Sequence, residues 1–281
     1  MNSEDIRSNR KKYIKSAIVL LIVITLLLFC NFQNKHLETT HYTYEAEQLG
    51  VDLDGYRIVQ ISDLHNAKFG KNNQKLVDRI RECAPDMIVL TGDLVDSNHT
   101  NVDRAVQFVN EIVKICPVYY VTGNHEYWLD TSEYENLMDG VASAGVIILD
   151  NQVVEISRWD AKFRLVGLDD KSLADGTLEA LLSDEKELTV VLAHEPQYFA
   201  RYAGTGVDLV LSGHAHGGQF RLPFVGGIVA PDQGFLPEYT SGEYYMNGTE
   251  MIVSRGLGNS VIPVRLFNYP QIVCVELVGK H

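Results

Sequence analysis

Cysteine is scarce in this chain, and its cysteines are never closely spaced. The 281 residues contain four cysteines, at positions 30, 83, 116 and 274, and no two of them form a CxxC pair. This spacing encodes neither a zinc ribbon nor a disulfide framework. Cys30 belongs to an apolar N-terminal run, and the other three have apolar neighbours, so we interpret them as small buried hydrophobic residues.

Positive charge is also scarce outside the N-terminus. Lys and Arg total 24 against 37 Asp and Glu, a formal net charge of −13. Such a surface repels polyanions, so we expect no nucleic-acid partner. A few metal-binding carboxylates cannot account for so large an excess, and most of it is expected to be solvated surface.

Several well-known catalytic motifs are absent. Two His-Glu dipeptides occur, but Leu129 and Tyr198 stand where an HExxH helix needs its second histidine, which excludes a zincin. Two glycines follow His216, so there is no HxHxDH run of the lactamase type. The chain also lacks a P-loop, a complete dinucleotide fingerprint and a GxSxG elbow.

The sequence has one long apolar run, which lies near the N-terminus. Residues 17–30 are apolar apart from Thr25, and residues 13–32 give the length of about 20 residues that crosses a bilayer. Basic residues precede the run, so the positive-inside rule keeps the N-terminus in the cytoplasm. A cleaved signal peptide is the alternative, but no small-x-small cleavage site follows.

These features predict a single-pass protein of the cell membrane. We expect a cytoplasmic basic segment at residues 1–12, an uncleaved transmembrane signal anchor at 13–32, a polar tether at 33–55 and one domain at 56–281. The domain is expected on the extracytoplasmic side of the membrane.

The domain alternates short apolar runs with amphipathic stretches. Runs rich in Val, Ile and Leu predict buried strands at 56–62, 87–92, 118–123, 190–193 and 209–213. Apolar residues at helical spacing predict helices at 73–84 and 102–116. Ser132 and Glu135 form a possible capping box for a third helix, and 153–156 with 163–168 predict a hairpin. The fold class is therefore α/β with mixed sheets.

Polar side chains follow each of these five strands at the point where it ends. They are Asp63 and His65, then Asp93, then Asn124 and His125, then His194, and finally His214 and His216. Because ligands collect at the carboxyl ends of strands in α/β sheets, five such ends can meet at one site. Imidazole, carboxylate and amide groups without thiolate suit Zn, Mn or Fe better than Ca or Mg.

Each motif by itself has an ordinary structural explanation. Asp63 is suited to capping a turn, and Gly-Asp and Gly-Asn are common turn dipeptides. However, five of the nine histidines lie at these strand ends. Burying five imidazoles with three other polar groups is costly unless something organises them, and metal ions would do so.

The ordered motifs Asp63-x-His65, Gly92-Asp93, Gly123-Asn124-His125-Glu126, Ala193-His194 and Gly213-His214-Ala215-His216 resemble the calcineurin-like metallophosphoesterase superfamily. The resemblance runs from Tyr56 to about Phe220. The later segments 254–257 and 263–265 resemble the membrane-anchored YaeI/YkuE-like branch, which is similar to UDP-2,3-diacylglucosamine pyrophosphatases. The resemblance implies a four-layer α-β-β-α sandwich of mixed sheets that follows an N-terminal transmembrane helix.

The resemblance also implies a role for each residue. Asp63, His65 and His216 would hold the first of two divalent metal ions (Mn, Fe or Zn), and Asp93 would bridge to the second. Three further residues, Asn124, His194 and His214, would complete the second site. The catalytic residue would be His125, which would reach the substrate phosphate or protonate the leaving oxygen.

Such a site predicts hydrolysis of a phosphodiester, pyrophosphate or phosphomonoester. Two cations held there would turn a bound water into hydroxide near neutral pH, which would attack phosphorus, and they would neutralise the developing charge. The alternative is a catalytically silent scaffold that acts as an envelope binding module, but such a scaffold is expected to have lost ligands.

The anchor and nearby aromatic residues favour a lipid-linked or cell-envelope substrate. The aromatic residues are Phe220, Phe224, Phe235, Tyr239, Tyr244 and Tyr245, for which packing is the alternative role. Four basic residues are candidates for contact with substrate, although a solvated side chain is the alternative for each: Lys68, Arg221, Arg255 and Arg265.

Overall fold

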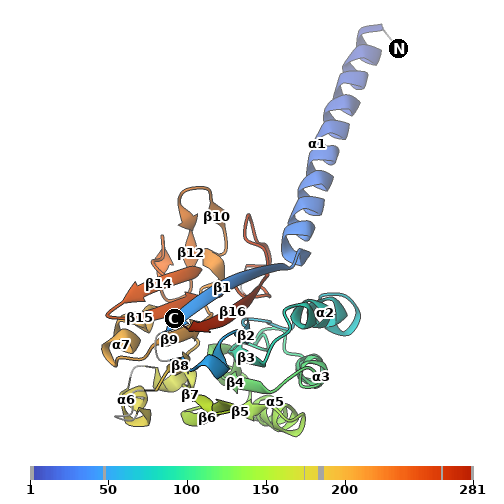
Figure 1. Ribbon diagram of the computed structural model, residues 1–281. Coiled ribbons are helices and arrows are strands. Elements are labelled where there is room, and N and C mark those ends of the chain that lie inside the picture. Colours follow the sequence, from blue (N-terminus) through green and yellow to red (C-terminus); the bar gives the residue numbers. More distant parts are fainter. Residues whose placement is uncertain (1–2, 47–48, 174, 183–186, 261, 280–281) are drawn as a thin grey trace.

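Two six-stranded sheets face each other in the computed structural model, and helices cover their outer faces (Figure 1). The structure describes residues 3–46, 49–173, 175–182, 187–260 and 262–279. Each of the five predicted strands is present, with ends within one or two residues of those expected.

The first sheet has the strand order β1-β16-β2-β3-β4-β5. Neighbours from β2 to β5 are parallel, β16 is antiparallel to β2, and β1 is parallel to β16. The strands are β1 (Glu38–Ala46), β16 (Gln271–Gly279), β2 (Tyr56–Ile61), β3 (Met87–Thr91), β4 (Val118–Val121) and β5 (Ile147–Ile148).

The second sheet has the order β14-β15-β9-β8-β7-β6. Its middle strands are parallel, and an antiparallel pair closes each side, including the predicted hairpin of β6 and β7. The strands are β14 (Gly242–Met246), β15 (Thr249–Val253), β9 (Leu209–Ser212), β8 (Thr189–Leu192), β7 (Ala161–Gly167) and β6 (Gln152–Arg158).

Helices and short strand pairs complete the described part of the chain. The α-helices are α1 (Ser3–Lys35), α2 (Gln74–Glu82), α3 (Val102–Ile112), α4 (Asn124–Tyr127), α5 (Thr131–Ser143), α6 (Thr177–Leu181) and α7 (Phe199–Gly204). The 3-10 helices are η1 (Val51–Leu53), η2 (Lys71–Asn73), η3 (Asp170–Ser172), η4 (Pro196–Tyr198) and η5 (His216–Gly218). Two short hairpins pair β10 (Arg221–Leu222) with β11 (Gly226–Gly227) and β12 (Val229–Ala230) with β13 (Gly234–Phe235).

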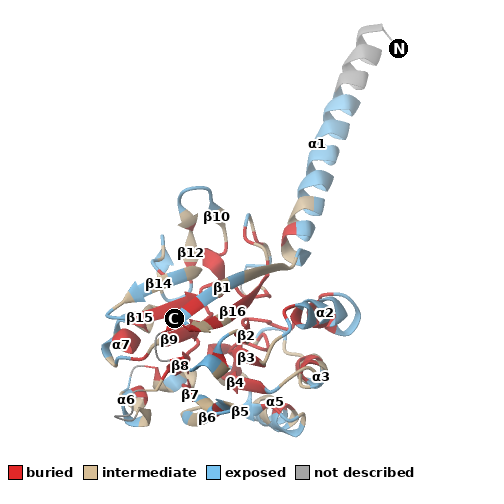
Figure 2. Cartoon of the chain, viewed as in Figure 1, coloured by how far each residue is buried: buried red, intermediate tan, exposed pale blue. Residues whose placement is uncertain are grey.

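Three hydrophobic clusters join these elements into four layers. One cluster fills the space between the two sheets, where Ile58 and Val89 from the first meet Leu165 and Leu192 from the second. The other two lie between the first sheet and α2, α3 and α5, and between the second sheet and α6 and α7. Buried residues are therefore concentrated in the strands, as Figure 2 shows. The predicted α-β-β-α sandwich of mixed sheets is confirmed.

The third predicted helix begins two residues earlier than the capping-box pattern indicated. The Asp130 carboxylate accepts a hydrogen bond from the backbone N–H of Glu133 at 2.8 Å, so Asp130 is the N-cap of α5. Ser132 instead donates its hydroxyl to the same carboxylate. An aspartate two residues upstream therefore takes the role expected for the serine.

The segment 33–55, expected to be a polar tether, differs from that expectation in the structure. Residues 38–46 form β1, which pairs with β16 along its whole length, and α1 continues to Lys35. An edge strand exposes much of its surface, so it tolerates the polar and Thr/Tyr-rich composition that suggested a tether. The folded domain therefore begins well before residue 56.

Among the described residues, α1 is the one helix long and apolar enough to cross a membrane, judged by length and composition. The qualifying stretch is Lys12–Lys35, which contains the predicted segment 13–32. In Figure 1, α1 projects away from the sandwich.

Strand register places the end of α1 at a particular edge of the first sheet. Glu38 at the start of β1 pairs with Gln271, and Val273 two residues along β16 pairs with Gln60 near the end of β2. The helix therefore leaves the domain at the edge where β2, β3 and β4 end. This is the edge to which the predicted ligands belong.

Candidate metal centre

The turns that follow β2, β3, β4, β8 and β9 bring the predicted ligands to one buried place. Every one of them is less than one-tenth exposed. These residues are Asp63, His65, Asp93, Asn124, His194, His214 and His216. Since the strands belong to both sheets, the site forms where the two sheets meet at their carboxyl edges.

One group of potential ligand atoms comes from Asp63, His65, Asp93 and His216, and all of these atoms lie within 4.8 Å of one another. The His65 Nε2 atom is 3.4 Å from Asp93 Oδ2 and 3.2 Å from His216 Nε2. Asp63 Oδ1 is 3.6 Å from His216 Nε2. The potential ligand atoms of these four residues therefore surround one point.

A second group of potential ligand atoms comes from Asp93, His194 and His214. The Asp93 Oδ2 atom is 3.2 Å from His194 Nε2, which is 3.2 Å from His214 Nδ1. Asn124 completes this group, because its Oδ1 is 3.0 Å from His214 Nδ1 and 3.2 Å from His194 Nε2. The Asp93 Oδ2 atom thus lies in both groups.

The outer ring nitrogens of His194 and His214 support a fit between these two donors and metal ions. His194 Nδ1 lies 2.7 Å from the carbonyl oxygen of Thr91, and His214 Nε2 lies 2.9 Å from a carboxylate oxygen of Asp232. Both outer nitrogens must donate to these acceptors, so the nitrogens that face the group are the ones free to offer a lone pair. The site therefore contains imidazole nitrogens and carboxylate and amide oxygens, as transition metals prefer.

Burial and charge set the protonation of the centre. Burial lowers the pKa of His65 and of His216, which keeps both rings neutral. Burial alone would raise the pKa of Asp93, but the imidazoles of His194 and His65 hold it well below its usual range. Burial likewise opposes charge on His194, yet Asp93 and Asp63 raise its pKa well above the ordinary value. A cation bound here would replace that proton.

The backbone is strained at the same positions. Five of the seven residues have positive φ angles: Asp63 (50°), His65 (43°), Asp93 (54°), His214 (62°) and His216 (47°). Residues other than glycine rarely adopt this region, and such strain gathers at functional sites. Close packing adds to the constraint, because a Cβ atom on Gly92 would lie 2.4 Å from His194 Nδ1.

Comparison with known proteins agrees with this geometry. Residues 56–218, more than half of the chain, match the calcineurin-like phosphoesterase family. The chain belongs to this family. It is therefore a metal-dependent phosphoester hydrolase with the metallophosphoesterase fold. Members of the family typically bind two divalent metals, and the buried His/Asp groups described above suit such ions.

Three relatives place the chain in the YaeI/YkuE-like branch of the family. It is 32% identical to the uncharacterized metallophosphoesterase YkuE of Bacillus subtilis over 87% of each chain. It is 30% identical to the phosphodiesterase YaeI of Escherichia coli, over 79% of this chain and 82% of that protein. A zebrafish (Danio rerio) transmembrane protein with a metallophosphoesterase domain is 28% identical over 83% of this chain and 55% of its own length.

Glu126 of this phosphoesterase organises the centre, a role that was not among those predicted. Its buried carboxylate accepts hydrogen bonds from the backbone N–H groups of Gly123 (2.7 Å), Asp93 (2.9 Å) and Leu94 (2.8 Å). One side chain thus ties the turn after β3 to the turn after β4. Its presence in the Gly123–Glu126 motif was the signal available in the sequence.

Replacing Glu126 with alanine is expected to lower the free energy of unfolding by about 3 kcal/mol or more, since each buried N–H left without an acceptor costs about 1–3 kcal/mol. Urea unfolding of the detergent-solubilised protein measures this change. Glu135→Ala, at an exposed position on α5, is the matched control and should change stability little. Equal stability of the two variants would contradict the proposed role of Glu126.

Asp232 orients His214 and was also missed. It follows β12 in an irregular Gly-rich segment, where no spacing or periodicity distinguishes one acidic residue from another. Its hydrogen bond with His214 lowers the pKa of its carboxyl group, which keeps the carboxylate charged. A carboxylate behind a ligating imidazole fixes the tautomer and the direction of the ring.

Asp232→Ala is expected to weaken metal binding by about 10- to 100-fold, the usual effect of losing such an outer partner. Competition between the protein and a chelator of known affinity measures the change. The matched control is Asp139→Ala, at an exposed position on α5. An affinity equal to that of the control would show that His214 needs no partner at Nε2.

His125 lies beside the first group of ligand atoms. Its ring centroid is 4.5 Å from that of His65, and its Nδ1 accepts the backbone N–H of Ser97 at 3.1 Å. Because Nδ1 is an acceptor, the proton of the neutral ring belongs on Nε2. Nε2 is 3.1 Å from the hydroxyl oxygen of Ser260, which lies on the loop before β16.

Arg265, considered above as a residue in contact with substrate, has a structural role instead. The side chain is fully buried, and it donates to the Asn259 side chain at 3.0 Å and to the Arg255 carbonyl at 2.8 Å. Burial lowers the pKa of this guanidinium group. Arg221 similarly donates to the Gly217 carbonyl at 2.9 Å. These contacts brace the loops behind the site.

Phe220, one of the six aromatic residues suggested as a substrate rim, is half-buried and forms a β-bridge with Leu266. The other five divide into two groups. Tyr239 is buried and Tyr244 packs against it within the cluster behind the second sheet, with ring centroids 5.0 Å apart. Phe224, Phe235 and Tyr245 are exposed. The first pair therefore serves packing, and only the exposed side chains are available to a ligand.

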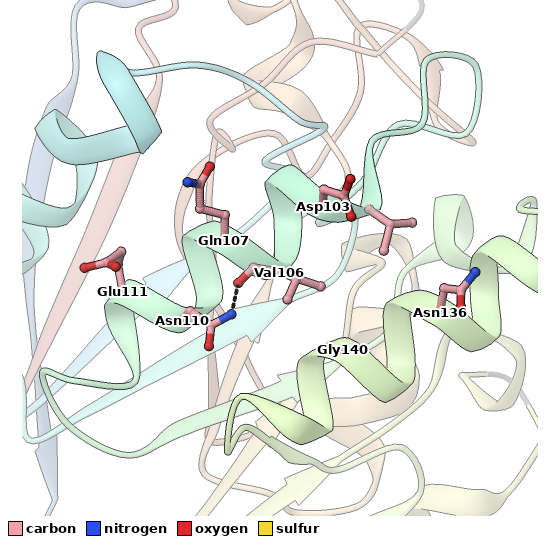
Figure 3. A pocket seen from close by; sticks show the side chains of 8 residues that line it. Asp103, Val106, Gln107, Asn110, Glu111, Asn136 and Gly140 are labelled. Atoms are coloured by element: carbon pink, nitrogen blue, oxygen red, sulfur yellow. Dashed lines mark hydrogen bonds between the residues drawn. The ribbon is translucent and has the colours of Figure 1, made fainter.

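A groove on the outer helical layer is separate from the metal centre. It lies between α3 and α5 and has a volume of about 670 Å³ (Figure 3). Its lining residues are Val102, Asp103, Val106, Gln107, Asn110, Glu111, Asn136 and Gly140. None of them is a predicted ligand, and the groove contains neither histidine nor cysteine, so the chemistry is assigned to the strand ends.

Proposed function

We propose that this protein hydrolyses a phosphodiester, pyrophosphate or phosphomonoester with two divalent metal ions. The observation that carries the proposal is the position of Asp93 Oδ2, 3.4 Å from His65 Nε2 and 3.2 Å from His194 Nε2. One carboxylate oxygen shared by two groups of ligand atoms is what a pair of close cations requires to offset their repulsion.

The donor atoms support one assignment of ligands. Asp63, His65, Asp93 and His216 would hold the first ion. Asp93 would also help to hold the second ion, with Asn124, His194 and His214. Bound there, the ions supply positive charge that activates water and stabilises a phosphate in its transition state. Mn, Fe and Zn all suit these donors.

His125 is proposed to handle the oxygens of the substrate. The backbone N–H of Ser97 occupies Nδ1, so the Nε2 proton is directed toward the first group of ligands and Ser260. From there it donates to a phosphate oxygen or to the departing oxygen. The chain thus provides a proton donor on one side of the site.

Metal analysis coupled to a panel of phosphoesters tests this function. The detergent-solubilised protein is expected to contain up to two metal ions per chain and to hydrolyse bis-p-nitrophenyl phosphate when Mn²⁺ is supplied. Absence of hydrolysis of every phosphoester with each of Mn²⁺, Zn²⁺ and Fe²⁺ would instead favour the catalytically silent binding module.

We further propose that α1 anchors the protein as a single membrane span, with the domain on the extracytoplasmic side. The apolar length of α1 supports a membrane span, and the basic residues before it support this orientation. We also propose a substrate linked to lipid or to the cell envelope, because an anchored domain works beside the membrane. Protease treatment of spheroplasts should degrade the domain, whereas protection of it would reverse the orientation.

A further inference from the structure

The end of α1 is bound to a loop that precedes β16. The Asn34 side chain donates to the Pro263 carbonyl at 2.8 Å and accepts the backbone N–H of Arg265 at 2.9 Å. The Phe29 and Phe267 rings pack edge to face with centroids 6.0 Å apart. These contacts attach the last turns of the helix to residues 262–267, so the domain is held in one orientation relative to α1.

No spacer separates the apolar part of α1 from the domain. The candidate span is Lys12–Lys35, somewhat longer than the roughly 20 residues that a bilayer requires. Strand β1 begins at Glu38, three residues after the helix ends. If α1 spans the membrane, residues 262–267 must lie at the membrane surface.

Two neighbouring loops expose apolar side chains at this end of the domain. Phe224 and Val225, in the turn between β10 and β11, are exposed, Phe224 fully so at 110%. Phe267 on the adjacent loop is 54% exposed. Phe220 and Leu266 form a β-bridge that joins the two loops. In Figure 1 the β10 hairpin and α1 extend from the same side of the sandwich.

The aromatic ring of Phe224 does not contribute to packing of the domain, because it is fully exposed. The residue lies in a turn and has a φ angle of 66°, a conformation that bulky residues rarely adopt. A fully exposed phenylalanine in such a turn gains nothing from folding, whereas aromatic side chains are favoured at the boundary between lipid and water. The turn is therefore suited to lipid.

Basic residues lie on the other side of α1. Lys35 at the end of the helix donates to the Lys68 carbonyl at 2.9 Å, and Lys71 and Lys75 follow at exposed positions. Such a group stands out in a chain with a formal net charge of −13. Exposed lysines next to a membrane span attract anionic headgroups where the leaflet that they face contains them.

The loop that precedes β16 also reaches the metal centre. Ser260 lies 3.1 Å from His125 Nε2, and the side chain of Gln219, three residues after His216, donates to the carbonyls of Ile262 and Val264 at 2.8 Å. The wall of the centre is therefore continuous with the loops that carry the exposed apolar side chains.

We propose that the edge of the domain carrying the metal centre rests on the bilayer, with the β10–β11 turn and residues 262–267 in its headgroup layer. The substrate class that fits is a phosphoester of a membrane-embedded amphiphile, taken from the bilayer without release into water. This inference rests on the proposed membrane anchor and hydrolase function.

Fluorescence quenching in vesicles tests the contact independently of catalysis. The chain has two tryptophans, so Phe224→Trp in a Trp128→Phe, Trp159→Phe background gives a single probe at the turn. The full chain is reconstituted in phosphatidylcholine–phosphatidylglycerol vesicles that contain brominated lipid. We expect strong quenching at position 224, because it enters the headgroup layer.

The matched control is Trp128→Phe, which keeps only Trp159. That residue is 77% exposed in the turn between β6 and β7, near the start of β2 and therefore at the edge opposite the metal centre. It should be quenched little. Equal quenching of the two probes would overturn the proposal. Cross-linking of position 224 to a second copy of the chain would also overturn it, because the turn would then contact protein and not lipid.

Hydrolysis of two matched substrates provides the second test. Phe224→Ser combined with Val225→Ser should lower hydrolysis of hexadecyl p-nitrophenyl phosphate in vesicles by about tenfold, through lost burial of apolar area in lipid. Hydrolysis of soluble bis-p-nitrophenyl phosphate should not change, and Trp159→Ser should affect neither. Equal rates of vesicle hydrolysis in variant and parent would overturn the membrane contact. If the parent protein hydrolyses neither substrate, the proposed function fails while the quenching result still decides the membrane contact.

Discussion

Asp93→Asn is expected to reduce bound metal below two ions per chain and to lower kcat by about 10³-fold or more, since the charge between two cations supplies several kcal/mol. The reason is geometric. Among the described residues, Asp93 is the one shared by the two groups of ligand atoms, and its Oδ2 lies near both His65 Nε2 and His194 Nε2. An asparagine amide has no net charge, so it cannot offset the repulsion between two ions at that position.

Elemental analysis of the purified variant, together with its turnover of bis-p-nitrophenyl phosphate, measures both effects. Asp103→Asn is a suitable control, because that residue is exposed in the first turn of α3, ten positions further along the chain. The control should keep the metal content and turnover of the parent. Two ions per chain in Asp93→Asn would remove Asp93 as the bridge.

His125→Ala is expected to keep both metal ions while kcat falls by about 10²-fold or more, the usual effect of losing a proton donor. Neither of the two groups of ligand atoms includes the His125 ring, so removal of that ring leaves both groups complete. What is lost is the Nε2 proton beside them. The combination of retained metal and slow turnover separates this residue from the ligands.

His99→Ala serves as the matched control, because this histidine lies in the same turn as Ser97 and its side chain is 87% exposed. It should behave as the parent protein does. A fall in kcat with unchanged KM would indicate that His125 acts in the transition state, whereas a rise in KM alone would indicate that it only binds phosphate. Unchanged values of both would exclude it from the reaction.

The strands and the order of the motifs could be predicted because they depend on local sequence. Runs such as 87–92 and 209–213 are almost continuously apolar, and every residue of β3 and β9 is buried. This pattern is typical of parallel strands whose sheet is covered on both faces. Each such strand must end where polar residues begin. The positions of Asp93 and His214 were therefore readable from the chain alone.

β1 could not be predicted in the same way. Its residues alternate between partly buried and exposed, and an edge strand needs no continuous apolar run. Its partner β16 lies more than 200 residues further along the chain. No local pattern carries information about such a distant pairing, so residues 38–46 had the appearance of a tether.

Asp232 and Glu126 illustrate a different limit. A carboxylate that accepts backbone N–H groups or orients an imidazole is recognisable only once its partner is known. His214 and Asp232 are 18 residues apart across irregular chain, and their hydrogen bond depends on how that chain folds. Composition and periodicity describe faces of helices and strands, and neither applies to such a segment.

The sequence by itself determined the family, the apolar N-terminal helix and which polar residues end the buried strands, because each of these depends on neighbouring residues. Only the tertiary structure decided that Asp93 Oδ2 belongs to both groups of ligand atoms, that Asp232 supports His214, and that α1 leaves the domain at the edge of the metal centre. These facts depend on the register and packing of segments far apart in the chain, which are set when the two sheets close on a common core.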